Sequence, residues 1–213
     1  IVVYGATGFT GSLCVKYLKN NYSDIRWAVA GRDEKKLRQV HSLAESYGAS
    51  AGYCTANLRD PNDIKQLVQI VRNKMPKVDV LVNCAGVFPV NSLSDSTFKE
   101  FNECFDINIR APFLLSKEFS KDMIKSRWGR IVNIGSSSSY SGFKQTSVYC
   151  ASKHALLGLS RSLSAELKEH NIKVYCFSPG SVKTEMGKKV KGQDFDTFID
   201  PHEVARFIAF SIS

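Results

Sequence analysis

Short apolar segments alternate with stretches that have the apolar spacing of a helix along almost the whole chain. The segment at 78–82, Val-Asp-Val-Leu-Val, is nearly all apolar, which is typical of a parallel strand covered on both faces. Strands alternating with helices predict a doubly wound, Rossmann-type α/β fold with a single parallel sheet and helices on both of its faces. Six strands are expected, at residues 1–4, 27–30, 53–58, 78–82, 130–134 and 172–177.

The helical stretches are not interrupted by any repeat or low-complexity segment, so we expect residues 1–213 to form one domain. Proline within a helix removes a backbone donor, so the long stretch at 95–128 should be distorted near Asn108 and Pro112. The segment 181–200 has weak periodicity and mixed polarity, and we interpret it as a substrate lid with short helical pieces. One helix is expected directly after the first strand, and others at 34–47, 62–74, 149–169 and 201–210.

A glycine-rich turn joins the first strand to the first helix, with the pattern Gly5-x-x-Gly8-x-x-Gly11. Glycines allow a tight turn and a close approach of the backbone to a pyrophosphate, and the helix N-terminus offers free N–H groups to the phosphates. Strand, glycine turn and helix together are the context that a dinucleotide-binding fingerprint requires. We therefore predict that this turn binds a dinucleotide through Gly5, Thr7, Gly8, Phe9, Thr10 and Gly11.

The second strand ends at Gly31-Arg32-Asp33, where the adenosine ribose of a dinucleotide normally lies. A carboxylate at this point favours NAD, whereas an arginine accommodates the 2′-phosphate of NADP. No carboxylate lies within the strand and Arg32 comes first, so we predict NADP(H) in preference to NAD(H). Alternatively, Arg32 is an ordinary solvated residue and Asp33 caps the helix at 34–47. This interpretation and the cofactor-binding one can both be true.

A serine-rich loop follows the strand at 130–134 and leads into a helix that carries Tyr149 and Lys153. These two residues are four apart, so they share one face of the helix. An ammonium beside a phenol stabilises the phenolate, and the pair is expected to lower the pKa of Tyr149 and make it a proton donor. A half-buried tyrosine beside a solvated lysine is the simpler alternative, but the position at the carboxyl end of a strand favours a ligand site.

Composition narrows the range of partners. The net charge of +9 allows phosphorylated cofactors, acidic carrier proteins or nucleic acid, but the basic residues are scattered and no nucleic-acid-binding motif is present, so we expect no nucleic-acid partner. No apolar run has the length of a membrane span, so we expect no membrane partner. The six cysteines form no Cys-x-x-Cys pair, which predicts no metal site and a reducing, cytoplasmic location.

Most of the chain resembles the short-chain dehydrogenase/reductase family. The resemblance implies an NADP(H)-dependent oxidoreductase that interconverts a ketone and a secondary alcohol by hydride transfer, with a small-molecule carbonyl or alcohol as substrate. The joint order and spacing of the matching residues is specific, although each motif alone is weak. The matching residues are Gly5, Gly8, Gly11, Asn83-x-Ala85-Gly86, Asn108, Ser136, Tyr149-x-x-x-Lys153 and Pro179-Gly180.

The resemblance also implies roles for these residues. Tyr149 would be the general acid or base, and Ser136, thirteen residues before it, would hydrogen-bond the substrate oxygen. Lys153 would bind the nicotinamide ribose and lower the pKa of Tyr149, and the backbone carbonyl of Asn108 would hold a water that links Lys153 to solvent. Further cofactor contacts are implied at Asn57, Leu58, Asn83, Ala85, Gly86, Pro179, Gly180, Val182 and Thr184.

Some features depart from the family pattern. The glycine spacing is that of its extended or atypical branches, Asn57 stands where an aspartate usually contacts adenine, Cys84 replaces a common asparagine, and the usual final strand is missing. The atypical turn leaves open a non-catalytic NADP-binding regulatory protein. The basic residues at 183–191 leave open a 3-oxoacyl-thioester reductase acting on carrier protein or coenzyme A. The long helices at 95–128 and 149–169 resemble those that pair in family dimers, which predicts a homodimer or homotetramer.

Overall fold

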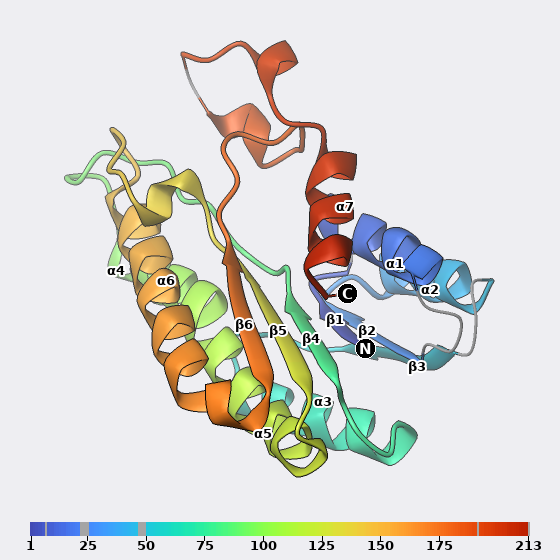
Figure 1. Cartoon of the computed structure of the whole chain (residues 1–213). Helices are drawn as coiled ribbons and strands as arrows, with labels where there is room; N and C mark the ends of the chain where they lie inside the picture. Colours follow the sequence, from blue (N-terminus) through green and yellow to red (C-terminus); the bar gives the residue numbers. More distant parts are fainter. Residues whose placement is uncertain (7, 22–25, 47–49, 191, 213) are drawn as a thin grey trace.

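A computed structural model describes residues 1–6, 8–21, 26–46, 50–190 and 192–212 of the chain. Within these residues, six parallel strands form one sheet in the order β3-β2-β1-β4-β5-β6, with helices on both faces (Figure 1). The fold class predicted from the sequence is therefore confirmed. The strands are β1 Val2–Tyr4, β2 Trp27–Gly31, β3 Ser50–Thr55, β4 Val80–Asn83, β5 Gly129–Ile134 and β6 Ile172–Phe177.

The strand order reverses between β1 and β4, because the chain leaves β3 at one edge of the sheet and returns on the other side of β1. In the register of the sheet, Tyr4 lies opposite Asn83, and Asn83 lies opposite Asn133. The carboxyl ends of β1, β4 and β5 therefore meet at one edge. Open α/β sheets bind ligands at such a point of reversal.

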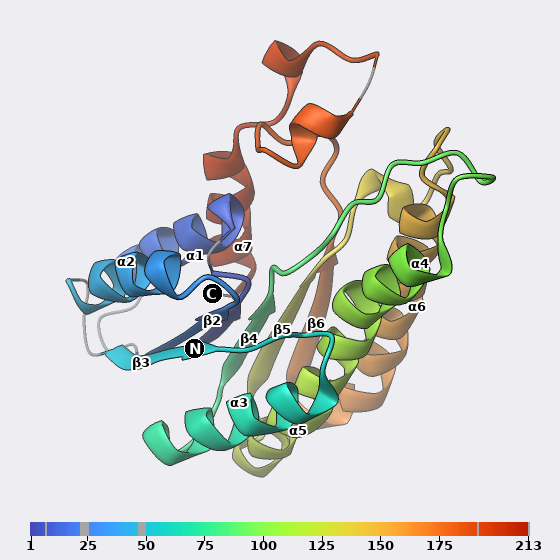
Figure 2. The same ribbon diagram turned by 180° about the vertical axis from the view of Figure 1, so that it is seen from behind.

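Two groups of helices cover the two faces of the sheet (Figures 1 and 2). The helices α1, α2 and α7 pack on one face, and α3, α5 and α6 pack on the other, with α4 beside α6. No helix in the described part of the chain has the length and apolar character needed to cross a bilayer. The helices are α1 Phe9–Asn21, α2 Glu34–Glu45, α3 Pro61–Lys74, α4 Phe98–Phe105, α5 Ala111–Ser126, α6 Ser147–Leu167 and α7 Pro201–Ile212.

The alternation of side chains along β1 explains why its sequence is entirely apolar. Val2 and Tyr4 point into the core under α3 and α5, whereas Val3 points into the core under α1 and α7. All three are buried. Burying a valine side chain completely contributes about 1.5–3 kcal/mol, so both faces of this short strand hold it in the centre of the sheet.

Local capping signals set the starts of two helices. The Asp33 carboxylate accepts a hydrogen bond from the Lys36 backbone N–H at 3.0 Å at the start of α2, which confirms its predicted capping role. Asp60 caps α3 in the same way, with Pro61 at the first helical position. Such caps contribute about 1 kcal/mol each. The predicted end of the first of these helices, Tyr47, lies outside the described residues.

The expected distortion near Asn108 is a five-residue π-helix, Asp106–Arg110, between α4 and α5. Pro112 sits in the first turn of α5, which continues directly from the π-helix, so its missing N–H leaves a backbone carbonyl of the preceding turn without a helical donor. The stretch at 95–128 is thus two α-helices around a π turn, and it begins at Phe98 because Thr97 and Glu100 form a capping box. Such single π turns are frequent at functional sites.

The segment 181–200 rises above the carboxyl edge of the sheet (Figure 1). Its described part contains short 3₁₀ turns at Gly187–Lys189 and Phe195–Thr197, which match the short helical pieces expected there. Its two ends are held together by a parallel bridge between Val182 and Ile199. The segment is therefore a closed loop on a narrow base, between β6 and α7.

Candidate active site

Ser136 lies two residues after the end of β5 and caps the 3₁₀ turn Ser137–Ser139. Its hydroxyl oxygen accepts a hydrogen bond from the Ser138 N–H at 3.1 Å. The turn is tied to the end of β6, because the Ser137 N–H donates to the Pro179 carbonyl at 2.8 Å. The serine loop therefore has a defined position at the carboxyl edge of the sheet.

Tyr149 lies in the first turn of α6 and is only 8% exposed. Burial raises the pKa of its phenol to about 12, and a side-chain hydrogen bond with Ser136 opposes this shift. The sequence predicted a pKa below the ordinary value, so the direction was wrong for the protein's own groups. The loss of hydration of the buried phenolate outweighs the favourable hydrogen bond.

Lys153 shares a helix face with Tyr149, as predicted, but it is buried rather than solvated, with 4% exposure. Its ammonium donates a hydrogen bond of 2.7 Å to the Ile134 carbonyl, and Nζ lies 5.6 Å from the centre of the Tyr149 ring. Burial lowers the pKa of Lys153 to about 8. A buried lysine with this pKa can exchange a proton near neutral pH.

The Asn108 side chain links three parts of the site. Its amide N–H donates to the Val87 carbonyl at 3.1 Å and to the Ser152 hydroxyl at 3.0 Å, and its carbonyl oxygen accepts from the Val87 N–H at 3.0 Å. Ser152 in turn donates to the Tyr149 carbonyl at 2.7 Å. The π-helix, the loop after β4 and the start of α6 are thus joined by one buried network.

Ser152 was missed by reasoning from the sequence, although it is completely buried. The available signal was a serine on the same face of the helix as buried apolar residues, and such a residue needs a hydrogen-bond partner. The side-chain role of Asn108 does not follow from the sequence, which predicts a role only for its backbone carbonyl. Both roles involve the hydrogen bond between Asn108 and Ser152, which are 44 positions apart.

The glycine turn packs against the backbone of the loop after β4. Gly5 has φ +80°, and a β-carbon there would lie 2.4 Å from the Ala85 nitrogen. A β-carbon on Gly11 would lie 2.4 Å from the Gly5 carbonyl oxygen. The turn therefore tolerates no side chain at these two positions, and it brings the first predicted cofactor segment into contact with Ala85.

The start of α1 suits a pyrophosphate. The first turn of this helix carries no acidic residue that would repel an anion, and the N–H groups at a helix N-terminus favour one. Together with the close packing of the glycines, this observation fits a dinucleotide, which Gly8 and Thr10 would contact. Thr7 lies outside the described residues, and Phe9 is placed by its backbone only, at the first position of α1.

Gly86 joins the cofactor side of the site to the catalytic side. A β-carbon at Gly86 would lie 3.4 Å from the Asn108 amide oxygen and 3.8 Å from the Lys153 nitrogen. Three residues earlier, the chain leaves β4 at Asn83, whose amide N–H donates to the Asn133 side chain at 2.8 Å. The loop is therefore anchored in the sheet and lies between the glycine turn and the lysine.

The predicted adenosine end is only partly assembled. Arg32 is exposed just after β2. Its charge acts on the buried Tyr4 at the end of β1: burial raises the pKa of the Tyr4 phenol, and the Arg32 charge opposes that shift. The Asn57 amide oxygen already accepts two hydrogen bonds of 3.2 Å from Arg59. Leu58 is buried in the core. The Asn57 backbone is bonded within the protein as well, because its N–H donates to the Asp63 carboxylate and its carbonyl accepts from the Asp60 N–H, both at 2.9 Å.

The predicted contacts after β6 form the base of the segment 181–200. The Thr184 N–H donates to the Val182 carbonyl at 2.7 Å, and the Thr184 hydroxyl accepts from the Gly187 N–H at 3.1 Å. A β-carbon on Gly180 would lie 3.7 Å from the Ile199 side chain. Pro179, through its bond to Ser137, connects this base to the serine loop.

Comparison with known proteins gives a consistent result. A family model described as short chain dehydrogenase matches residues 1–194. The 3-oxoacyl-[acyl-carrier-protein] reductase FabG of Rickettsia felis is 30% identical over 222 residues, which cover 100% of this chain and 88% of the relative. The crystal structure of acetoin dehydrogenase YohF from Salmonella typhimurium has a TM-score of 0.88 and 26% identity, covering 100% of this chain and 87% of that one.

A further solved structure contains a bound cofactor. It is a candidate NAD(P) dependent gluconate 5-dehydrogenase from Beutenbergia cavernae with NADP at low occupancy. It matches with a TM-score of 0.90 and 25% identity, and the match covers 100% of this chain and 88% of that one.

Proposed function

Because the chain belongs to the short-chain dehydrogenase/reductase family, we propose that it is an NADP(H)-dependent oxidoreductase that interconverts a ketone and a secondary alcohol. The observation that carries this proposal is the convergence of Ser136, Tyr149 and Lys153 at the edge where the glycine turn meets the loop after β4. The cofactor, when bound, supplies or accepts the hydride. The protein's own residues handle the proton and hold the substrate oxygen.

In the direction of reduction, Tyr149 gives its proton to the substrate oxygen. With a pKa of about 12 the phenol is protonated at neutral pH, as a general acid must be. The Ser136 hydroxyl is its hydrogen-bond partner, so a carbonyl oxygen beside the phenol can accept from both hydroxyls. Two donors stabilise the charge that develops on this oxygen.

Lys153 has two tasks in this scheme. Its buried ammonium offsets the negative charge left on Tyr149 after proton transfer. It also returns a proton to the phenolate, which is feasible because its pKa is about 8. We propose that a water held by the Asn108 backbone carbonyl, in the π turn, connects Lys153 to solvent.

A direct assay tests the proposal. NADPH oxidation is measured with a panel of ketones, and NADP⁺ reduction with the matching alcohols. Turnover of at least one pair supports an oxidoreductase. Tight NADPH binding with no turnover on any substrate would instead favour a non-catalytic regulatory protein.

Arg32 supports the preference for NADP(H), since it is exposed where the second strand ends. Replacing Arg32 by serine is expected to weaken NADPH binding by about 10- to 100-fold, because hydrogen bonds to charged groups contribute about 1.5–3 kcal/mol. NADH binding, which lacks the 2′-phosphate contact, should change little. Fluorescence titration of both cofactors measures this, with the exposed neighbour Lys35→Ser as a control. Equal weakening for both cofactors would contradict the assignment.

The pH dependence of reduction follows from Lys153. We expect kcat/KM to fall as the pH rises through about 8, because burial lowers the pKa of Lys153 to about 8 and the reaction uses its ammonium form. Below that pH the lysine is charged and the rate should not depend on it. Initial rates across the pH range measure the profile. The bend should vanish in Lys153→Met, and a bend that persists there belongs to another group.

The remaining residues implied by the family resemblance are assigned to the cofactor and the substrate. We propose that the cofactor is bordered by Asn57, Leu58, Asn83, Ala85, Gly86, Pro179, Gly180, Val182 and Thr184, and that the segment 181–200 closes over the substrate.

The aromatic side chains Phe98 and Phe113, on α4 and α5, are 78% and 43% exposed. They support our proposal of a homodimer or homotetramer, since exposed apolar side chains on neighbouring helices suit an interface. A cytoplasmic location remains part of this proposal.

A 3-oxoacyl-thioester reductase is the second candidate. It is supported by the FabG relative and by Lys183, Lys188 and Lys189 on the segment 181–200. If these lysines attract an acidic carrier protein, kcat/KM for a carrier-bound 3-oxoacyl thioester should fall several-fold as salt rises from low to physiological strength. An uncharged short thioester serves as the control. Carrier-bound rates that do not change with salt would contradict this docking role.

A further inference from the structure

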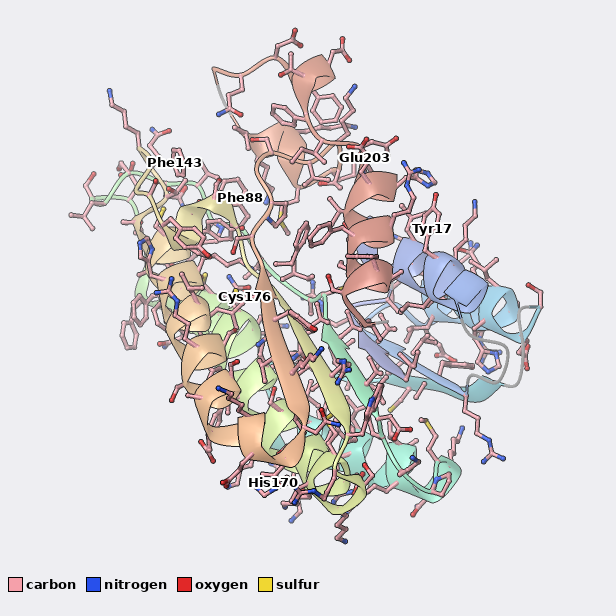
Figure 3. The ribbon with its side chains drawn as sticks, in the orientation of Figure 1. Tyr17, Phe88, Phe143, His170, Cys176 and Glu203 are labelled. Atoms are coloured by element: carbon pink, nitrogen blue, oxygen red, sulfur yellow. The ribbon has the colours of Figure 1, made fainter. Side chains whose placement is uncertain are left out.

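Phe88 is the aromatic residue in contact with the Tyr149 ring. It follows Gly86 by two positions in the loop after β4, and its ring centre lies 4.5 Å from that of Tyr149, at an interplanar angle of 63°. This is an edge-to-face pair, which contributes more than its buried area alone. Phe88 is partly exposed, so part of its ring borders the surface beside the phenol. Figure 3 shows it above the carboxyl ends of the strands, at the end of the sheet opposite His170.

The position of Phe88 is fixed by its neighbour. Both backbone groups of Val87 are bonded to the Asn108 side chain, at 3.0 and 3.1 Å. Asn108 is bonded at 3.0 Å to Ser152, which lies on the same helix as Tyr149. The backbones of Val87 and Tyr149 are therefore joined by one network, and the Phe88 ring lies against the ring of the proton donor.

Two loops beyond Phe88 carry further apolar side chains. The loop after β4 and the loop before α6 are joined by a hydrogen bond of 2.9 Å from the Asn91 N–H to the Gln145 carbonyl. Leu93 on the first loop is 81% exposed, and Tyr140 and Phe143 on the second are 58% and 48% exposed. Figure 3 shows Phe143 at the same end of the molecule as Phe88. Large apolar side chains exposed together on adjoining loops mark a binding surface.

We propose that Phe88 determines the substrate class, and that this class is ketones or secondary alcohols with an apolar chain or aryl group next to the reacting carbon. The inference rests on the proposed function, since it places the substrate oxygen on Tyr149 and Ser136. A substituent on that carbon then lies against the Phe88 ring. A polar substituent there loses its water and gains no hydrogen bond from the ring, which disfavours it.

The test uses two measurements on one series of compounds. The first is kcat/KM with NADPH for 2-butanone, 2-hexanone and 2-octanone. The second is calorimetric binding of the matching alcohols to the protein with NADPH, a combination that cannot turn over. Each methylene that contacts the ring should raise kcat/KM and tighten binding about fourfold.

Variants separate a specificity role from a structural one. In Phe88→Ala the gain should fall below about twofold per methylene, so the loss of kcat/KM relative to the parent should grow from 2-butanone to 2-octanone. Phe88→Leu, which stays apolar, should keep most of the gain. Phe210→Ala removes a distant phenylalanine that is 73% exposed, and it should match the parent.

Two results would overturn the inference. One is an equal loss for all three ketones in Phe88→Ala, which would mean that the ring only positions Tyr149. The other is a parent protein whose binding and kcat/KM do not increase with chain length. Alcohol binding that tightens with chain length through Phe88, without turnover of any ketone, would support this inference and defeat the proposed function. Turnover that does not depend on chain length would support the proposed function and defeat this inference.

Discussion

Replacing Tyr149 by phenylalanine is expected to lower kcat for ketone reduction by about 10²- to 10⁴-fold, the usual contribution of a positioned general acid. The substitution removes one hydroxyl from a side chain that is 8% exposed and keeps the ring that packs against Phe88. The fold and the glycine turn are not touched. The dissociation constant for NADPH should therefore change far less than kcat.

Steady-state kinetics with NADPH and the best ketone of the panel measure the loss, and fluorescence titration measures cofactor binding. Tyr140→Phe is a matched control, because Tyr140 lies in the neighbouring serine loop and is 58% exposed. It should retain the parent rate. Equal rates in Tyr149→Phe and the parent would remove Tyr149 from the mechanism and leave the proton donor unassigned.

Replacing Gly5 by alanine is expected to lower the free energy of unfolding by about 2–5 kcal/mol. Gly5 has φ +80°, and this left-handed conformation costs an alanine about 1–2 kcal/mol. The new β-carbon would also lie 2.4 Å from the Ala85 nitrogen, and overpacking of this kind costs about 1–3 kcal/mol. Because the clash is with backbone, no rotation of a side chain relieves it.

Gly8→Ala provides the matched control within the same turn. Its φ is not in the left-handed region, and its β-carbon would lie 3.3 Å from the Gly5 carbonyl oxygen, a tight contact that a small shift relieves. Denaturant unfolding of the two variants and the parent measures the difference. Coincident unfolding curves for the two variants would contradict the close packing of Gly5 against Ala85.

The Gly5→Ala variant also tests whether the glycine turn is coupled to the catalytic side of the site. Ala85 contacts the glycine turn, and the next residue, Gly86, lies near Asn108 and Lys153. A shift of Ala85 is therefore expected to displace the catalytic side of the site as well. Any Gly5→Ala protein that folds should show a reduced kcat in addition to weaker cofactor binding.

Several features followed from the sequence because they depend on neighbours along the chain. The alternation of apolar strands and helical spacing predicted the parallel sheet, and the i, i+4 spacing placed Tyr149 and Lys153 on one helix face. Asp33 was expected to cap the next helix, and it does. The break near Asn108 was expected, although its form as a π turn was not.

Other features were decided by packing between distant segments. The pKa of Tyr149 rises because α6 and its surroundings bury the phenol, and no sequence pattern states how complete that burial is. The Lys153 ammonium bonds to Ile134, which is 19 residues away, and Asn108 bonds to Val87 and Ser152. Spacing along the chain determined which side chains are near each other on one element. Only the tertiary structure decided their partners and their hydration, because both depend on which elements close over them.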